Sequence, residues 1–144
     1  MQVQIAAQDR NWAMAAHLSA LIAVAGLPFG HIVGPLVVYL IKAHESEFVA
    51  EHARASLNYQ ITVSIVGFVG VIAAVAVMLG YIASGSAQQM SDAGTPLSLA
   101  VFWIAIAIAV LLILLVSLIF IIAGTVAASQ GRTYNYPFAI RFLR

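Results

Sequence analysis

The chain has 144 residues, of which 63% are hydrophobic and only 8% are charged. Because soluble domains carry about 25% charged residues, this composition excludes an ordinary soluble fold. A net charge of +1 gives no basis for a nucleic-acid partner, and the absence of cysteine excludes disulfides and thiolate metal sites. The length leaves room for a single membrane domain, residues 1–144.

The first apolar region, residues 12–41, is interrupted by five helix-breaking residues within ten positions. These are Gly26, Pro28, Gly30, Gly34 and Pro35. A straight helix through residues 27–35 is therefore not expected. The remaining apolar pieces, residues 12–25 and 32–41, reach only about 21 Å and about 15 Å, too short to span a bilayer comfortably. A pair of short helices and a single kinked span both fit, and the Pro-Phe-Gly turn signal favours the pair.

The next segment, residues 46–60, is predicted to be a charged helix. Ser46 fits an N-cap, and an acidic residue follows it in the first turn. Polar positions then recur at steps of four, three and four, which places them on one helical face. They are Glu47, Glu51, Arg54 and Asn58. No helix breaker precedes Ile61, so this helix can continue into the apolar stretch that follows.

Two long apolar stretches dominate the rest of the chain, residues 61–83 and 97–128. No residue between Arg54 and Asp92, or between Asp92 and Arg132, is charged. Each stretch is longer than the roughly 20 residues that a helix needs to cross a hydrocarbon layer about 30 Å thick. Both are therefore predicted to be membrane spans.

The polar residues 84–96 are predicted to link the two spans, because they contain two glycines and a proline. After the second span, Gly131 fits a helix C-terminus. The last residues, 133–144, alternate aromatic and basic side chains, a pattern typical of the membrane–water interface. The predicted fold class is all-α: an integral membrane helical bundle with two long spans plus a short helical pair broken at residues 27–35.

His17 lies within an apolar run, where an unpaired polar group would be costly. Its expected partners are Asn58 and Gln60 at the start of the first span. The candidate polar cluster comprises His17, Ser19, Asn58 and Gln60. One interpretation is an interhelical hydrogen-bond cluster that fixes the bundle. The alternative is a proton or substrate pathway in a small transporter or oligomeric channel, although the spans lack acidic residues.

The charged helix and the basic C-terminus supply candidate interfacial ion pairs. The residues concerned are Glu47, Glu51, Arg54 and Arg141. Pairs at helical spacing are worth only a few tenths of a kcal/mol, about 0.2–0.5 each. The tail is expected to pack its aromatic side chains against this helix and to bring Arg141 close to Glu47 or Glu51.

A metal site or an enzyme active site is not predicted. His44 and His52 are eight residues apart, with a helix start between them, whereas an HExxH zinc site needs two histidines four apart. A membrane enzyme that uses Glu51 and His52 is a third possible class, but no nucleophile motif, P-loop or dinucleotide fingerprint accompanies these residues. We therefore predict no catalytic residue, no metal and no cofactor.

Several short motifs together resemble a known family. They are Trp12-Ala13-Met14, His17-Leu18-Ser19, Pro28-Phe29-Gly30, Gly34-Pro35-Leu36, Leu57-Asn58-Tyr59-Gln60 and Tyr134-Asn135-Tyr136-Pro137-Phe138. The pattern resembles a family of small bacterial membrane proteins of unknown function, distantly similar to the twenty-kilodalton component of the chloroplast inner-envelope protein import translocon. The resemblance implies a four-helix membrane topology and a remote association with protein translocation. The long polar link at residues 84–96 departs from the short link typical of that family.

The predicted function is therefore that of a non-enzymatic integral membrane protein with a structural, accessory or translocation-related role. The expected location is the bacterial inner membrane, with several membrane passes. The expected partners are membrane lipid and either a larger membrane complex or further copies of the chain.

The distribution of lysine and arginine predicts the orientation, because cytoplasmic segments carry the excess of these residues. Residues 84–96 contain neither, so we predict that this link lies outside and that both termini and the charged helix are cytoplasmic. Single cysteines would be labelled with an impermeant thiol reagent in intact cells. The positions are Gln8, Ser46, Ser86 and Ser129. Only Ser86 should react; labelling at Ser46 instead would reverse the orientation, and outside labelling at Gln8 would replace the helical pair by one kinked span.

Overall fold

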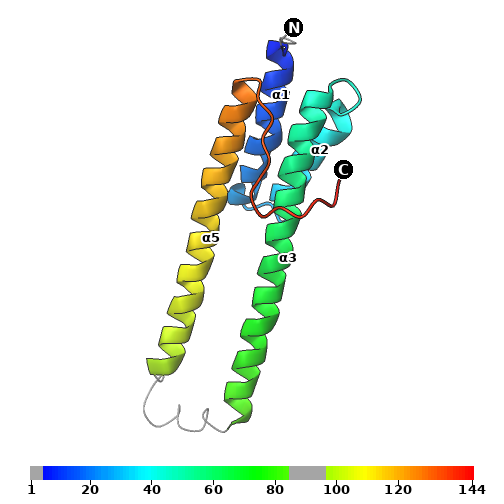
Figure 1. The fold of residues 1–144 in the computed structure, drawn as a ribbon. Helices are drawn as coiled ribbons and strands as arrows, with labels where there is room; N and C mark the ends of the chain where they lie inside the picture. Colours follow the sequence, from blue (N-terminus) through cyan, green and yellow to red (C-terminus); the bar gives the residue numbers. More distant parts are fainter. Residues whose placement is uncertain (1–4, 85–96) are drawn as a thin grey trace. The chain divides into compact units, whose positions relative to one another are not determined.

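The structure is a computed structural model, and it describes residues 5–84 and 97–144. These residues form helices and connecting segments without any β-strand, which confirms the predicted all-α class. The elements, shown in Figure 1, are α1 (Ala7–Leu18), the 3₁₀ helix η1 (Ser19–Ala25), α2 (Gly30–Lys42), α3 (Glu47–Ala83) and α5 (Leu97–Ser129). The predicted link at residues 84–96 falls, apart from Ser84, outside the described residues.

The chain divides into two compact units, the first formed by Met1–Ser64 with Ser117–Arg144 and the second by Ile65–Val116. All six lysine and arginine residues of the sequence belong to the first unit. They are Arg10, Lys42, Arg54, Arg132, Arg141 and Arg144. In the sequence of the second unit Asp92 is the only charged residue. The first unit therefore contains nearly all the charged groups with which this protein can do chemistry.

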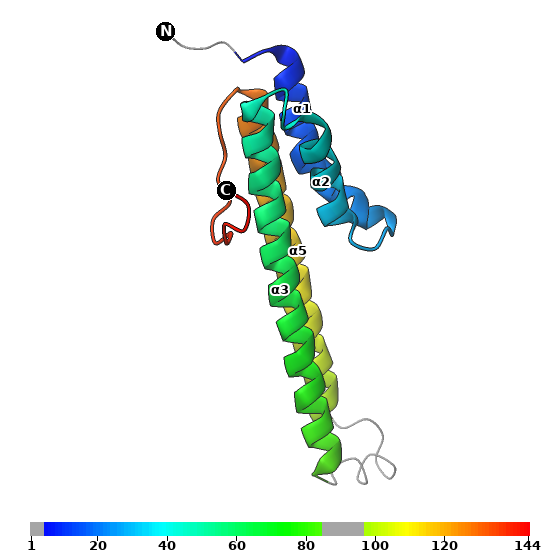
Figure 2. The ribbon, with the colours of Figure 1, turned by 90° about the vertical axis from the view of Figure 1, so that its right-hand side faces the viewer.

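The first apolar region forms a short helical pair, and Figure 2 shows α2 running back beside α1. The turn between η1 and α2 uses two left-handed residues, Gly26 with φ 86° and Phe29 with φ 57°. The break is narrower than the predicted residues 27–35, because α2 already begins at Gly30 and includes Pro35. Proline costs a helix one hydrogen bond, and Pro35 is fully buried, a burial that favours its place within the helix.

Gly34 explains how α2 and η1 approach each other so closely. A Cβ atom added to Gly34 would lie 2.4 Å from the carbonyl oxygen of Ser19, which no real side chain could tolerate. The glycine that was expected to break the helix is therefore required inside it. Its missing side chain provides the space in which the two short helices pack.

The predicted charged helix, 46–60, and the predicted span, 61–83, form one continuous helix, α3, of 37 residues. Its start has the expected cap, because the backbone N–H of Val49 donates to Ser46 Oγ at 3.5 Å. The buried residues of α3 all lie between Val49 and Gln60, and from Ile65 onward its apolar side chains are largely exposed. Both α3 and α5 contain segments long and apolar enough to cross a membrane.

The core of the first unit is built from small and medium-sized side chains of three helices. Ala16 of α1, Val38 of α2, and Val49 and Ala53 of α3 pack together, and Trp12 covers one side. Small residues at these positions let the helices approach closely. This packing brings the end of α1 against the buried face of α3.

The end of α5 returns the chain toward this core. Gly131 has φ 70°, and the backbone N–H of Arg132 donates to the carbonyl oxygen of Ala127 at 3.0 Å. This is the Schellman arrangement that ends many helices at a glycine, as the sequence predicts. The chain then leaves the helix axis as an extended tail that lies against α3 (Figure 1).

Candidate functional site

Three buried side chains of the first unit, those of His17, His52 and Tyr136, meet at His17, the last but one residue of α1. His17 is completely buried. Its Nδ1 lies 2.8 Å from the hydroxyl of Tyr136 in the tail, and its Nε2 lies 2.8 Å from Nδ1 of His52 in α3. His52 Nε2 in turn lies 3.1 Å from the carbonyl oxygen of Arg132, just after α5. One chain of hydrogen bonds thus joins four segments of the protein.

The donor and the acceptor of each hydrogen bond in this network can be assigned from the Arg132 carbonyl oxygen at its end. The Arg132 carbonyl can only accept, so His52 Nε2 must carry the proton and donate. A neutral His52 then accepts at Nδ1, so His17 donates from Nε2. His17 must therefore accept at Nδ1 from the Tyr136 hydroxyl. All the nitrogen atoms of both rings are used, and the network needs no net charge.

The ionisation of His17 and Tyr136 agrees with this assignment. Burial first, and the neighbouring His52 ring second, lower the pKa of His17 to about 3. Burial also raises the pKa of the Tyr136 phenol well above its usual value. Because a low dielectric disfavours both imidazolium and phenolate, His17 is neutral and Tyr136 is protonated at neutral pH.

The space for the His17 ring depends on Gly124 of α5. A Cβ atom added there would lie 2.9 Å from His17 Nδ1 and 3.1 Å from the ring of Tyr134. On the other side, Tyr136 stacks on Tyr59 with 4.5 Å between ring centroids and 16° between ring planes. The network therefore lies between aromatic rings and the backbone of α5 at Gly124, where there is no side chain.

The tail beyond Tyr136 is held to α3 by Asn58. The Asn58 side-chain oxygen accepts from the backbone N–H groups of Phe142 and Leu143 at 3.0 Å and 2.8 Å. Its amide group donates to the Leu143 carbonyl oxygen at 3.0 Å. Thr62, one turn further along α3, accepts from the backbone N–H of Ile140 at 2.9 Å. Backbone groups that an extended tail would leave to water are thus satisfied by two side chains of one helix.

The residues of the predicted polar cluster are not brought together. His17 forms its hydrogen bonds with Tyr136 and His52 and with neither Asn58 nor Gln60, which corrects the partners expected for it. Asn58 binds the tail backbone instead. Gln60 Nε2 is buried without a hydrogen-bond partner among the described residues, and Ser19 Oγ donates to the carbonyl oxygen of Ala16 at 3.5 Å.

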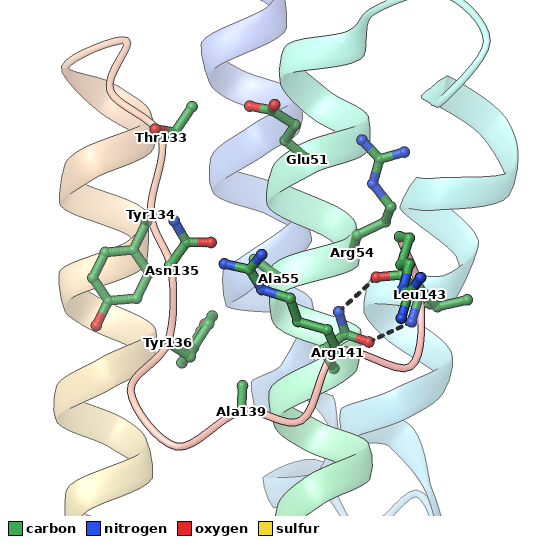
Figure 3. Close-up of a pocket in the computed structure, with 12 residues that line it drawn as sticks. Glu51, Arg54, Ala55, Thr133, Tyr134, Asn135, Tyr136, Ala139, Arg141 and Leu143 are labelled. Carbon is green, nitrogen blue, oxygen red and sulfur yellow. Dashed lines mark hydrogen bonds between the residues drawn. The ribbon is translucent and has the colours of Figure 1, made fainter.

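The predicted ion-pair residues are also only partly joined. Arg54 forms an ion pair with Glu47. Glu51 and Arg141 form no ion pair among the described residues, although both line a single cavity between α3 and the tail (Figure 3). In that tail Tyr136 is buried, as expected of an interfacial aromatic residue, but Phe138 is 91% exposed.

Comparison with known proteins identifies the family. A family model described as the magnetosome magnetite crystal formation protein family matches residues 8–143. The chain belongs to this family. This match assigns the chain to a definite family of membrane proteins. No similarity to the chloroplast translocon component is found. No curated protein and no solved structure matches the chain.

In this member of the magnetosome family the histidine network is unsuited to metal binding as it stands. A metal needs free nitrogen lone pairs, and those of His17 and His52 accept hydrogen bonds from Tyr136 and His17. The described residues also contain no group of three metal-ligating side chains. The arrangement is suited instead to joining α1, α3 and the tail.

His52 and Tyr136 are the members of the network that sequence reasoning did not select. In the sequence, His52 stands out only beside Glu51 as a possible metal or catalytic residue, and Tyr136 only as an interfacial aromatic residue. The sequence does contain a signal for His52, because a histidine on the apolar side of a partly charged helix needs a buried partner. Nothing in the local sequence relates it to a tyrosine more than 80 residues away.

Replacing Tyr136 by phenylalanine should destabilise this magnetosome family protein by about 1–3 kcal/mol, because His17 Nδ1 would remain buried without a donor. The matched control is Tyr134→Phe, since the Tyr134 hydroxyl makes no hydrogen bond among the described residues and its loss should change stability by less than about 0.5 kcal/mol. Thermal melting in detergent measures both. Equal melting temperatures for the two variants would contradict the network.

Replacing His17 by glutamine should reduce the sensitivity of the protein to acid. The folded protein resists protonation of His17 down to about pH 3, whereas an unfolded histidine binds a proton below about pH 6.5. Stability is therefore fully present above pH 6.5 and is lost as the pH falls, by about 2 kcal/mol between pH 7 and pH 5 from this group alone. Glutamine can accept from Tyr136 and donate to His52 without titrating.

The measurement is the difference in unfolding free energy between pH 7 and pH 5 for both proteins in the same detergent. His31 and His44 are the same in both proteins, and the glutamine still donates to His52 Nδ1, so the difference reports His17 together with its coupling to His52. Parallel pH profiles would show that His17 is not held neutral by burial.

Proposed function

We propose that this chain is a non-enzymatic integral membrane protein of the magnetosome membrane, and that it supports magnetite crystal formation as a structural or accessory component. The observation that carries the proposal is the family match over residues 8–143. The two long apolar helices support a place within the membrane. The multi-pass topology with cytoplasmic termini stays a prediction of the charge distribution, and the translocation-related role has no further support.

The use of the buried polar groups favours a structural role. Tyr136, His17, His52 and Asn58 use their polar atoms to hold segments of the chain to one another. A catalytic group, by contrast, must present at least one polar atom to a substrate. These four side chains are thus committed to the fold.

The transporter or channel alternative is not favoured by this geometry. It requires His17, Asn58 and Gln60 to form a continuous polar path, but His17 is hydrogen-bonded to neither of the other two. The path that does start at Tyr136 ends on the Arg132 carbonyl oxygen, which has no proton to pass on. A chain of hydrogen bonds with such an end holds a structure together more readily than it conducts protons.

The proposal is tested in a magnetite-forming bacterium that carries this gene. A fluorescent fusion to the chain should co-localise with the crystals and co-purify with isolated magnetosomes. Deletion of the gene should change the size or number of the crystals in electron micrographs, and the wild-type chain should restore them.

Two controls make the test specific. Tyr136→Phe, which weakens the network, should restore the crystals less well than Tyr134→Phe at equal expression. Vesicles containing the purified chain should show no proton or solute flux above that of empty vesicles. A fusion confined to the rest of the cell membrane with unchanged crystals on deletion would refute the proposal, and flux that His17→Gln abolishes without loss of stability would favour the transporter.

A further inference from the structure

The tail and the first part of α3 line an open cavity of about 570 Å³ whose chemistry the proposed function does not use. Figure 3 shows Glu51 and Arg54 projecting from α3 and Tyr134, Asn135 and Arg141 from the tail around this hollow. The volume lies within the range of about 300–1,000 Å³ that is usual for small-molecule sites. All of its lining residues belong to the first unit.

The side chains that line the cavity carry an excess of positive charge. Arg54, Arg141 and Arg144 are cationic, and Glu51 is the only acidic side chain among the lining residues. Arg54 is ion-paired with Glu47, which lies outside the cavity lining. Arg141 and Arg144 form no ion pair among the described residues. Two guanidinium groups thus remain available at the same hollow.

The positions of these two arginines are set by the backbone between them. Asn58 makes three hydrogen bonds to Phe142 and Leu143, the two residues that separate Arg141 from Arg144. The arginines therefore extend from a short stretch of chain that is fixed on α3. Placing like charges at one fixed site costs repulsion, and a bound anion would offset that cost.

We propose that this cavity binds an anionic phosphate group, and that its source is the headgroup of an anionic phospholipid. Guanidinium groups bind phosphate through paired, charge-assisted hydrogen bonds, which makes phosphate the best match for two free arginines. The surrounding tail points to a lipid as the source. Phe138, Ile140 and Phe142 are 91%, 54% and 47% exposed beside the arginines, and such apolar side chains suit a membrane surface. Free phosphate would offer the same chemistry without the apolar contact.

The test uses the full chain, purified in an uncharged detergent, with phosphatidylglycerol as the probe and phosphatidylcholine as the zwitterionic comparison. Native mass spectrometry counts the lipids that stay bound as each is titrated. Phosphatidylglycerol should bind more tightly than phosphatidylcholine, and Arg141→Gln should weaken its binding by about tenfold, the loss expected for one charge-assisted contact. The matched control is Arg132→Gln, which removes the same charge from the same tail outside the cavity and should change binding by less than twofold.

Glu51→Gln is expected to have an effect on lipid binding that a folding defect could not produce. It removes the negative charge from the cavity and should tighten phosphatidylglycerol binding, whereas Glu45→Gln, outside the cavity, should not. Competition by millimolar inorganic phosphate, with the same order of variants, would assign the site to free phosphate and still support a phosphate-binding cavity. Equal losses in Arg141→Gln and Arg132→Gln, or unchanged binding in both Arg141→Gln and Glu51→Gln, would overturn the proposal.

Discussion

The hydrogen bonds of one buried histidine are the interaction on which the first unit depends. His17 is surrounded by protein on all sides, so each of its nitrogen atoms must find a partner within the chain. Those partners come from α3 and from the tail, which places three segments in one arrangement. Leaving any bond in the network unmade would cost about 1–3 kcal/mol, a large fraction of the stability of a small domain. The polar network therefore selects the arrangement that the apolar packing alone would leave less well defined.

The position of the tail follows from this constraint. Tyr136 is tied to His17 at one end of the tail, and Phe142 and Leu143 are tied to Asn58 at the other. Between these two attachments the chain crosses α3, and the space left beneath it is the arginine-lined cavity. The Schellman turn at Gly131 makes this path possible, because it directs the chain back from α5. The path of the tail thus produces both the hydrogen-bond network around His17 and the arginine-lined cavity.

The elements that depend on local rules could be predicted from the sequence. The two long helices follow from stretches without charge, the start of α3 from Ser46, and the end of α5 from Gly131. The partners of His17 could not be predicted, since they are 35 and 119 residues away along the chain. Asn58 was a reasonable choice for that role by polarity. It lies six residues after His52, however, which rotates it by about 240° around the helix and onto a different face.

That second face is the part of the site that the sequence did predict. Glu51, Arg54 and Asn58 recur on one stripe of α3, and all three line the cavity beneath the tail. The sequence also predicts that the tail packs against this helix, but it does not show that Asn58 binds the tail backbone or that a cavity remains beneath the tail. Helical periodicity therefore identifies which side chains share a face, while the individual contacts made on that face depend on distant segments.

The glycines show how differently the two units constrain their sequence. A Cβ atom at Gly124 would collide with His17, and one at Gly34 would collide with the backbone of Ser19. At Gly67 and Gly70 in the second unit, an added Cβ would meet no atom within 4 Å. Glycine is therefore required by internal packing at Gly34 and Gly124, whereas Gly67 and Gly70 line an apolar pocket of the second unit in which a Cβ atom would fit. The first unit contains the charged groups, the buried network and the cavity, and the second supplies helix length and apolar surface to the membrane. Changes that alter the proposed phosphate site should therefore lie in the first unit, which contains all the residues that line its cavity.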